Sequence, residues 1–196
     1  MPTHARVWTP DEVRELQDES RPWPRYELID GELHVTPAPR PVHQVAAVEL
    51  LLRIAPYVKV HGLGRALLSP ADIALDQRSV LQPDVFVVPR GQLGSSGGPE
   101  PTWREVTGLL LAVEVVSPSS ARRDHGVKRR YYQRHGVPEY WIVDLDARLV
   151  ERWRPADERP EILSEALAWQ PRTELAPLTL DMSALFEEVH EEAGEA

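Results

Sequence analysis

The sequence predicts an α/β fold of the mixed, α+β kind, and three observations support this expectation. Short apolar runs typical of buried strands occupy residues 85–88, 109–116 and 140–144. Apolar residues recur at helical spacing over residues 41–58, and a second, basic helix is expected over residues 121–135. At 196 residues the chain is long enough for one sizeable core but short for two.

A helix and a hairpin are expected in the N-terminal part of the chain. Threonine, proline and two acids in succession predict a helix over about residues 10–19. Two short strands within residues 26–35 flank Asp30-Gly31, a pair of residues that favours a two-residue hairpin turn. Glu27 is therefore expected to lie on a strand.

The remaining strands are short. Residues 65–68 and 72–75 are expected to form two strands interrupted by Ser69-Pro70. Residues 149–153 are expected to pair with the buried strand at residues 140–144 across a turn.

We expect residues 1–196 to form a single domain with a core at about residues 26–154. Residues 1–25 would contribute the N-terminal helix and a proline-rich lead. Residues 155–196 would decorate the core, with a small amphipathic helix in which Leu185 and Phe186 point inward, followed by an acidic tail.

Composition excludes several classes of protein. The formal net charge of −9 argues against a protein that coats nucleic acid nonspecifically, although residues 122–135 form a local basic segment. The chain has no cysteine, which excludes disulfides, thiolate metal sites and cysteine nucleophiles and fits a reducing compartment. Because the sequence also has neither a membrane-length apolar run nor a secretory signal pattern, we expect a cytoplasmic protein.

Glu114 is the one charged residue in the apolar run 109–116. An isolated buried carboxylate is costly, so Glu114 should be paired, protonated or bound to a metal. Asp84 directly precedes the strand at residues 85–88, and two carboxylates on strands of one sheet form the oxygen-rich site that Mg²⁺ prefers. The main-chain carbonyl of Val115 can add a third oxygen. Either acid alone would more simply cap a turn or pair with an arginine, but together they favour a metal.

Lys128 is the expected cationic member of this site. It follows Asp124 by four residues on the basic helix, which begins beside the strand that carries Glu114. Lys128 can polarise a scissile phosphate or hold the attacking water, whereas the plainer interpretation is a solvated pair with Asp124. Glu27 can orient a metal-bound water, although an exposed strand glutamate is commoner. His43 ranks last, because lone histidines are usually surface or packing residues.

An ordered set of motifs runs through residues 26–144, each weak alone but specific in combination. The motifs are YELIDGE (26–32), His43-Gln44, QPDVFVV (82–88), AVEVVSPS (112–119), Asp124 with Lys128 and Tyr131 or Tyr132, and GVPEYWIVD (136–144). In this combination the sequence resembles the Uma-two family of restriction-endonuclease-like proteins, which belongs to the PD-(D/E)XK nuclease superfamily.

The resemblance implies a restriction-endonuclease-like core of mixed β-sheet flanked by helices. It places the first acid of the superfamily on Asp84, the second on Glu114 and an assisting glutamate at Glu27. The superfamily usually has lysine two residues after the second acid, where this sequence has Val116. Lys128, reaching in from the following helix, would be a migrated substitute.

Together, the site and the resemblance predict a metal-dependent endonuclease that hydrolyses phosphodiester bonds of nucleic acid, with DNA as the expected substrate. Mg²⁺, or Mn²⁺ in its place, would be bound by Asp84, Glu114 and Val115. A homodimer is expected because closed dimers are common among soluble proteins.

Three alternatives stay open at this point. The first is a catalytically inactive member of the same fold that binds nucleic acid or protein, which the valine at position 116 favours. The second is a metal-dependent enzyme that acts on a different substrate, which would suit the acidic net charge. The third is a structural protein that buries its apolar strands against a second copy.

Overall fold

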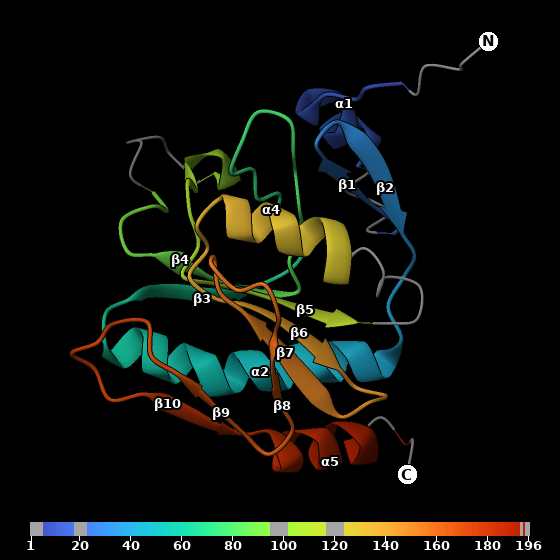
Figure 1. Ribbon diagram of the computed structural model, residues 1–196. Coiled ribbons are helices and arrows are strands. Elements are labelled where there is room, and N and C mark those ends of the chain that lie inside the picture. Colours follow the sequence, from blue (N-terminus) through green and yellow to red (C-terminus); the bar gives the residue numbers. More distant parts are fainter. Residues whose placement is uncertain (1–5, 18–22, 95–101, 117–123, 193, 195–196) are drawn as a thin grey trace.

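A six-stranded mixed sheet forms the centre of the fold (Figure 1). The structure is a computed structural model that describes residues 6–17, 23–94, 102–116, 124–192 and 194. In sheet order the strands are β3 (Gly64–Leu68), β4 (Val85–Pro89), β5 (Leu111–Val116), β6 (Tyr140–Asp144), β7 (Leu149–Trp153) and β8 (Glu161–Leu163). Only β5 and β6 run parallel, and every other neighbouring pair is antiparallel. The predicted α/β fold with a mixed sheet is confirmed.

The central strands are apolar on both faces because helices cover both faces. α2 (Pro41–Val60) and α5 (Met182–Glu192) lie on one face, where Val113 and Val115 of β5 join their core. α4 (Arg129–Arg134), preceded by the π-helical turn η2 (Asp124–Lys128), lies on the other face. Strand residues alternate between the two faces, so Glu114, which lies between Val113 and Val115, points to the α4 side.

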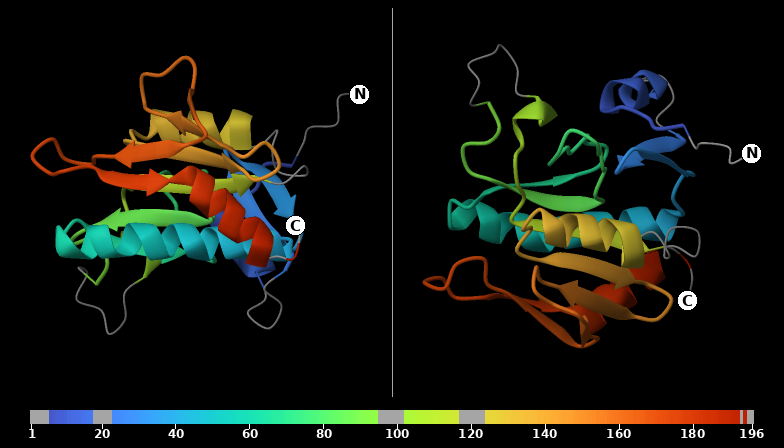
Figure 2. Two further views of the ribbon diagram at one scale, coloured as in Figure 1. Left: turned by 90° about the horizontal axis from the view of Figure 1, so that it is seen from below. Right: turned by 45° about the horizontal axis from the view of Figure 1, so that its top comes forward.

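The N-terminal hairpin stands beside the central sheet and is not part of it (Figure 2). β1 (Arg25–Ile29) and β2 (Glu32–Thr36) are joined by Asp30 and Gly31, both of which have positive φ, at 53° and 86°. This is the turn that the sequence predicts. The hairpin docks through two hydrogen bonds between the main chains of Leu28 and Val80.

The flanking elements largely follow the sequence. α1 (Pro10–Leu16) begins at a capping box between Thr9 and Glu12 and ends earlier than the predicted position of about 19, because Gln17 is already extended. A short 3₁₀ helix, η1, covers Trp103–Glu105. The first residues of the predicted basic helix, 121–123, lie outside the described residues.

One predicted strand is wrong. Residues 72–75 make only an isolated bridge, between Ile73 and Leu81. Ile73 and Leu81 are both fully buried, so the apolar residues of this segment pack into the α4-side core without extending a ladder.

Residues beyond position 155 contribute to the main core. β9 (Ala166–Trp169) pairs with β10 (Leu178–Asp181), and α5 packs against α2 (Figure 2). Trp169 and Phe186 belong to the same buried cluster as the central strands. No helix in the described part of the chain is long and apolar enough to cross a lipid bilayer.

Candidate functional site

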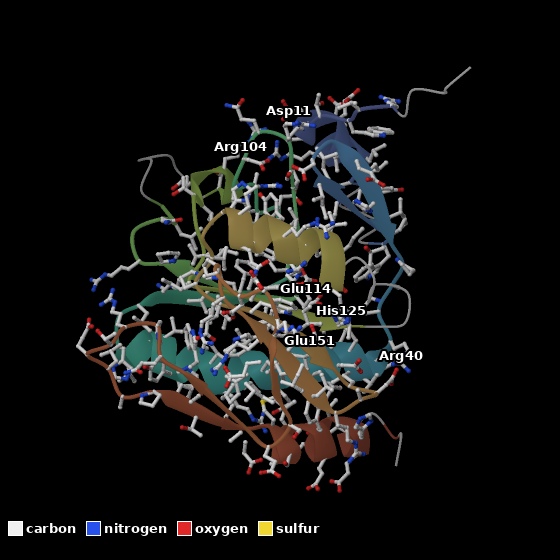
Figure 3. All side chains as sticks on the ribbon, viewed as in Figure 1. Asp11, Arg40, Arg104, Glu114, His125 and Glu151 are labelled. Atoms are coloured by element: carbon white, nitrogen blue, oxygen red, sulfur yellow. The ribbon has the colours of Figure 1, made fainter. Side chains whose placement is uncertain are left out.

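Asp84 directly precedes β4, and Glu114 lies on the neighbouring strand β5 at the centre of the sheet. Val85 of β4 is opposite Val113 of β5, and the same antiparallel register places Asp84 opposite Glu114. Asp84 is 9% exposed and Glu114 is 3% exposed. Figure 3 shows Glu114 in the interior, whereas the labelled residue Arg40 lies at the periphery. The sheet therefore brings the two acids of the predicted metal site to adjacent positions.

Lys128 lies at the centre of a buried ionic cluster. Its Nζ is 2.9 Å from Glu27 Oε1, 2.9 Å from Glu114 Oε2 and 3.6 Å from Asp124 Oδ1. None of these four side chains is more than 5% exposed. Three carboxylates share one ammonium group, so the fully ionised cluster has more negative than positive charge.

Hydrogen bonds fix the acids of this cluster. The main-chain N–H of Gln82 donates to Glu27 Oε1 at 2.9 Å, and the Tyr132 hydroxyl donates to Glu114 Oε1 at 3.4 Å. The hydroxyl of Tyr140 donates to the main-chain carbonyl of Asp124 at 3.2 Å. The carboxylate of Glu114 is thus held at both oxygens, by Tyr132 at Oε1 and by Lys128 at Oε2.

Burial raises the pKa of Glu114 well above its usual value. The attraction of Lys128 offsets part of this rise, while repulsion from Asp84, Asp124 and Glu27 adds to it. Since burial also raises the pKa of Tyr132, its hydroxyl stays protonated and can donate to Glu114. In the metal-free protein, ionised Glu114 is therefore unfavourable, and a bound cation would relieve this.

Asp84 has partners of its own. Its Oδ2 accepts a hydrogen bond from the Val115 main-chain N–H at 2.9 Å and lies 3.1 Å from His43 Nε2. Burial alone would raise the pKa of Asp84, but the hydrogen bond and charge of His43, with help from Lys128, hold it below its usual value. Burial opposes the charging of His43, yet its contact with Asp84 raises its pKa. Asp84 is therefore ionised at neutral pH.

The donor set suits Mg²⁺, although no ready-made cage is present. Within the described residues no group of three or more histidine, cysteine, aspartate or glutamate side chains is arranged to hold a metal. Mg²⁺ commonly keeps several of its waters and binds one or two carboxylates, which Asp84 and Glu114 can supply. The excess of buried carboxylate around Lys128 also favours a cation. In donor chemistry and in charge, the residues fit the ion.

Sequence reasoning underrates one residue of this site, His43, which ranks last among the expected candidates but contacts Asp84 directly. Glu27, an expected site residue, is buried and paired with Lys128, so the commoner alternative of an exposed strand glutamate does not apply. Arg25 was not singled out, although its Nη1 lies 3.8 Å from Asp84 Oδ1. The signal for Arg25 was its place two residues before Glu27 on the same strand, where side chains share a face.

Comparison with known proteins agrees with this fold. A family model described as "Putative restriction endonuclease", Uma2, matches residues 10–183. The chain belongs to the Uma2 family. No curated protein matches it. Among solved structures it is similar to the crystal structure, at 1.96 Å resolution, of a putative nuclease belonging to DUF820 from Anabaena variabilis. The TM-score is 0.71 at 22% identity, over 93% of this chain and 99% of that chain.

The family is described as putative restriction endonucleases, and the structural similarity shows that this chain shares the fold of the Anabaena protein. Val116, two residues after Glu114, is buried among the apolar side chains of the α4-side core. The lysine that lies beside Glu114 is Lys128, on η2, whose Nζ is 2.9 Å from Glu114 Oε2. The structure therefore brings Lys128 to Glu114 from a different element.

Proposed function

We propose that this Uma2 protein is a Mg²⁺-dependent endonuclease that hydrolyses phosphodiester bonds, with DNA as its substrate and the cytoplasm as its setting. Mn²⁺ would substitute for Mg²⁺. The observation that supports the proposal most is the buried excess of carboxylate, in which Glu27, Glu114 and Asp124 share the ammonium group of Lys128. A buried acid with a perturbed pKa beside other charged groups, as Glu114 is, is a frequent mark of a functional site.

The metal would be held by the carboxylates of Asp84 and Glu114 and by the main-chain carbonyl of Val115. When bound, Mg²⁺ would act as a Lewis acid: its positive charge would offset the negative charge of the phosphate, and it would lower the pKa of a coordinated water. Lys128 and Tyr132 already orient Glu114, so this carboxylate loses little further side-chain freedom on binding the ion.

In the proposed reaction Lys128 aligns the attacking water. Its ammonium group has three N–H donors, and it faces three carboxylates. The contact of Lys128 Nζ with Asp124, at 3.6 Å, is the longest of the three. The N–H group of Lys128 that faces Asp124 is therefore the one most readily turned toward the water. Glu27 would keep the amine in place meanwhile.

A cleavage assay on matched aspartate variants tests the proposal. Wild-type protein should cut DNA in Mg²⁺ or Mn²⁺ but not in EDTA, and Asp84→Asn should reduce the rate by about 10²-fold to 10³-fold. Asp146→Asn is the matched control, because Asp146 is 63% exposed and pairs only loosely with Arg40 at 3.5 Å. The readout is the rate of strand scission on double-stranded DNA, single-stranded DNA and RNA.

The outcomes of this assay separate the candidate functions. Cutting that survives Asp84→Asn would mean that the metal site lies elsewhere. Wild-type protein that binds DNA but never cuts it, with either metal, would support the inactive binding module instead. Cutting of RNA but not of DNA would overturn the substrate part of the proposal.

We also propose that the chain is a single domain that forms a homodimer. The single domain is supported by α5, which packs into the same core as α2. The homodimer is supported by Val48 and Leu52, which lie one turn apart on α2 and are 42% and 58% exposed. Light scattering should give the mass of a dimer for wild type and of a monomer for Leu52→Glu; a monomeric wild type at all concentrations would refute the dimer.

A further inference from the structure

The structure assigns a substrate-binding role to Arg25: we propose that its guanidinium group binds a phosphate oxygen of a nucleic-acid strand in the pocket beside Asp84. This inference deepens the proposed nuclease function and rests on it for the identity of the ligand. It concerns the pocket beside Asp84, whose lining does not include the four residues of the cluster around Lys128.

The pocket is lined by both polar and apolar residues and is large enough for a phosphate group. Its volume is about 220 Å³, several times the roughly 30 Å³ that one water occupies in the liquid. It is lined by Arg25, Pro39, His43, Gln44, Ala47, Val48, Leu68, Ser69 and Asp84. Arginine, histidine, glutamine and serine offer donor groups around it, and Asp84 is the one acid in this lining.

Arg25 enters this pocket with its donors uncommitted. Its guanidinium carbon lies 4.1 Å from the centre of the Trp23 ring, a cation–π contact that fixes the plane of the group. The ion pair with Asp84, at 3.8 Å, is too long for a hydrogen bond. In the part of the chain that the structure describes, the guanidinium donates no hydrogen bond to the protein.

A partly buried guanidinium group that donates no hydrogen bond to the described residues is unfavourable, and a ligand would supply acceptors. The side chain of Arg25 is only 14% exposed, and burial lowers its pKa, although an arginine keeps its charge. His43, which lines the same pocket, already contacts Asp84 through Nε2. Arg25 is therefore the group at this pocket whose charge an anionic, oxygen-rich ligand would satisfy.

Phosphate is the anion that this arrangement fits. The planar fork of an arginine matches two oxygens of one phosphate group, and stacking on Trp23 holds that fork in a fixed orientation. Asp84 forms part of the same pocket, so a phosphate bound by Arg25 would lie next to the proposed metal. The pocket thereby offers a phosphate site beside the metal ligand, within a chain whose net charge of −9 disfavours nonspecific binding.

The test measures binding without cleavage. A fluorescent double-stranded oligonucleotide is titrated with the full chain in EDTA, and anisotropy gives the Kd at several salt concentrations. Arg25→Ala should weaken binding about 10-fold and lower the slope of log K against log salt by about 0.9, the value for one phosphate contact. Arg104→Ala is the control for net charge, because Arg104 is 70% exposed and pairs with Asp11 far from the site (Figure 3); it should bind like wild type.

A second variant separates the effect of the planar guanidinium group from the effect of its positive charge. Arg25→Lys should keep the salt slope of wild type yet bind several-fold more weakly, since a lysine cannot form the two-point contact. If Arg25→Ala fails to give a cooperative thermal transition, Arg25→Lys decides the matter. Wild-type affinity in Arg25→Lys, an unchanged slope in folded Arg25→Ala, or an equal loss in Arg104→Ala would each overturn the inference.

Failure of the inference can be told apart from failure of the proposed function. If Asp84→Asn abolishes cleavage while the Arg25 variants bind as wild type does, only the role of Arg25 is refuted. If wild type cuts nothing but the Arg25 variants bind weakly as expected, the phosphate site stands and the nuclease activity is refuted.

Discussion

Lys128→Met is expected to lower the free energy of unfolding by about 3–5 kcal/mol, as the loss of one partner does in other buried ion clusters. The substitution removes the ammonium group but leaves Glu27, Glu114 and Asp124 buried together. A loss of this size is a large share of the stability of an ordinary domain. Urea denaturation followed by tryptophan fluorescence measures it.

The sequence contains one other lysine, which serves as a matched control. Lys59 is exposed in the last turn of α2, so Lys59→Met should change the free energy of unfolding by no more than about 0.5 kcal/mol. Adding Asp124→Asn to Lys128→Met should recover part of the loss, because one of the unpaired charges is then removed. A loss below about 1 kcal/mol in Lys128→Met would mean that the acids are protonated in the folded protein.

Glu114→Gln is expected to change stability and cleavage in opposite directions. Burial raises the pKa of Glu114, so the ionised carboxylate destabilises the metal-free protein at neutral pH. A neutral amide of nearly the same shape removes this effect and should stabilise the protein by roughly 0.5–2 kcal/mol. The same change removes a proposed metal ligand and should slow cleavage by about 10²-fold to 10³-fold.

Glu139→Gln is the matched control for this variant. Glu139 is buried, its pKa is also raised by burial, and its Oε2 accepts a hydrogen bond from Trp141 Nε1 at 2.8 Å, which an amide oxygen can also accept. Its folded-state pKa lies above the value of 4.5 for a free glutamate. Its contribution to stability is therefore present below that pH and is lost as the pH rises through the folded-state pKa.

Glu139→Gln should thus reduce the fall in stability above pH 4.5 while leaving the cleavage rate unchanged. Denaturation at a series of pH values, with the cleavage assay alongside, distinguishes the two glutamates. Equal cleavage by Glu114→Gln and Glu139→Gln would remove Glu114 from the proposed site.

The strands and helices were predictable where hydrophobic periodicity and turn chemistry agreed. The run around Glu114 is apolar at both strand faces, and Asp30-Gly31 tolerates the positive φ that a two-residue hairpin turn requires. The same reasoning wrongly predicted a strand at residues 72–75, since apolar side chains can be buried without strand pairing. Pattern alone does not specify which partner a short segment finds.

A site residue was predictable where its burial carries a high free-energy cost. A carboxylate in a buried strand needs a compensating partner, so Glu114 indicated a cation and Asp84 as a second ligand. The burial of Glu27 was not predictable, and Arg25 did not stand out, because both lie on a hairpin that docks beside the sheet through long-range contacts. His43 lies 41 positions before Asp84 along the chain, so only the folded structure brings the two together.

The delivery of Lys128 from η2 also bears on how related proteins can be recognised. Once the ammonium group reaches Glu114 from another element, position 116 is free to become a core residue, and here valine packs against apolar neighbours. Divergent relatives could then keep the charge arrangement while losing the linear spacing of acid and lysine. A search by the three-dimensional arrangement of an ammonium group and buried acids would find such relatives where a search for a sequence motif would pass over them.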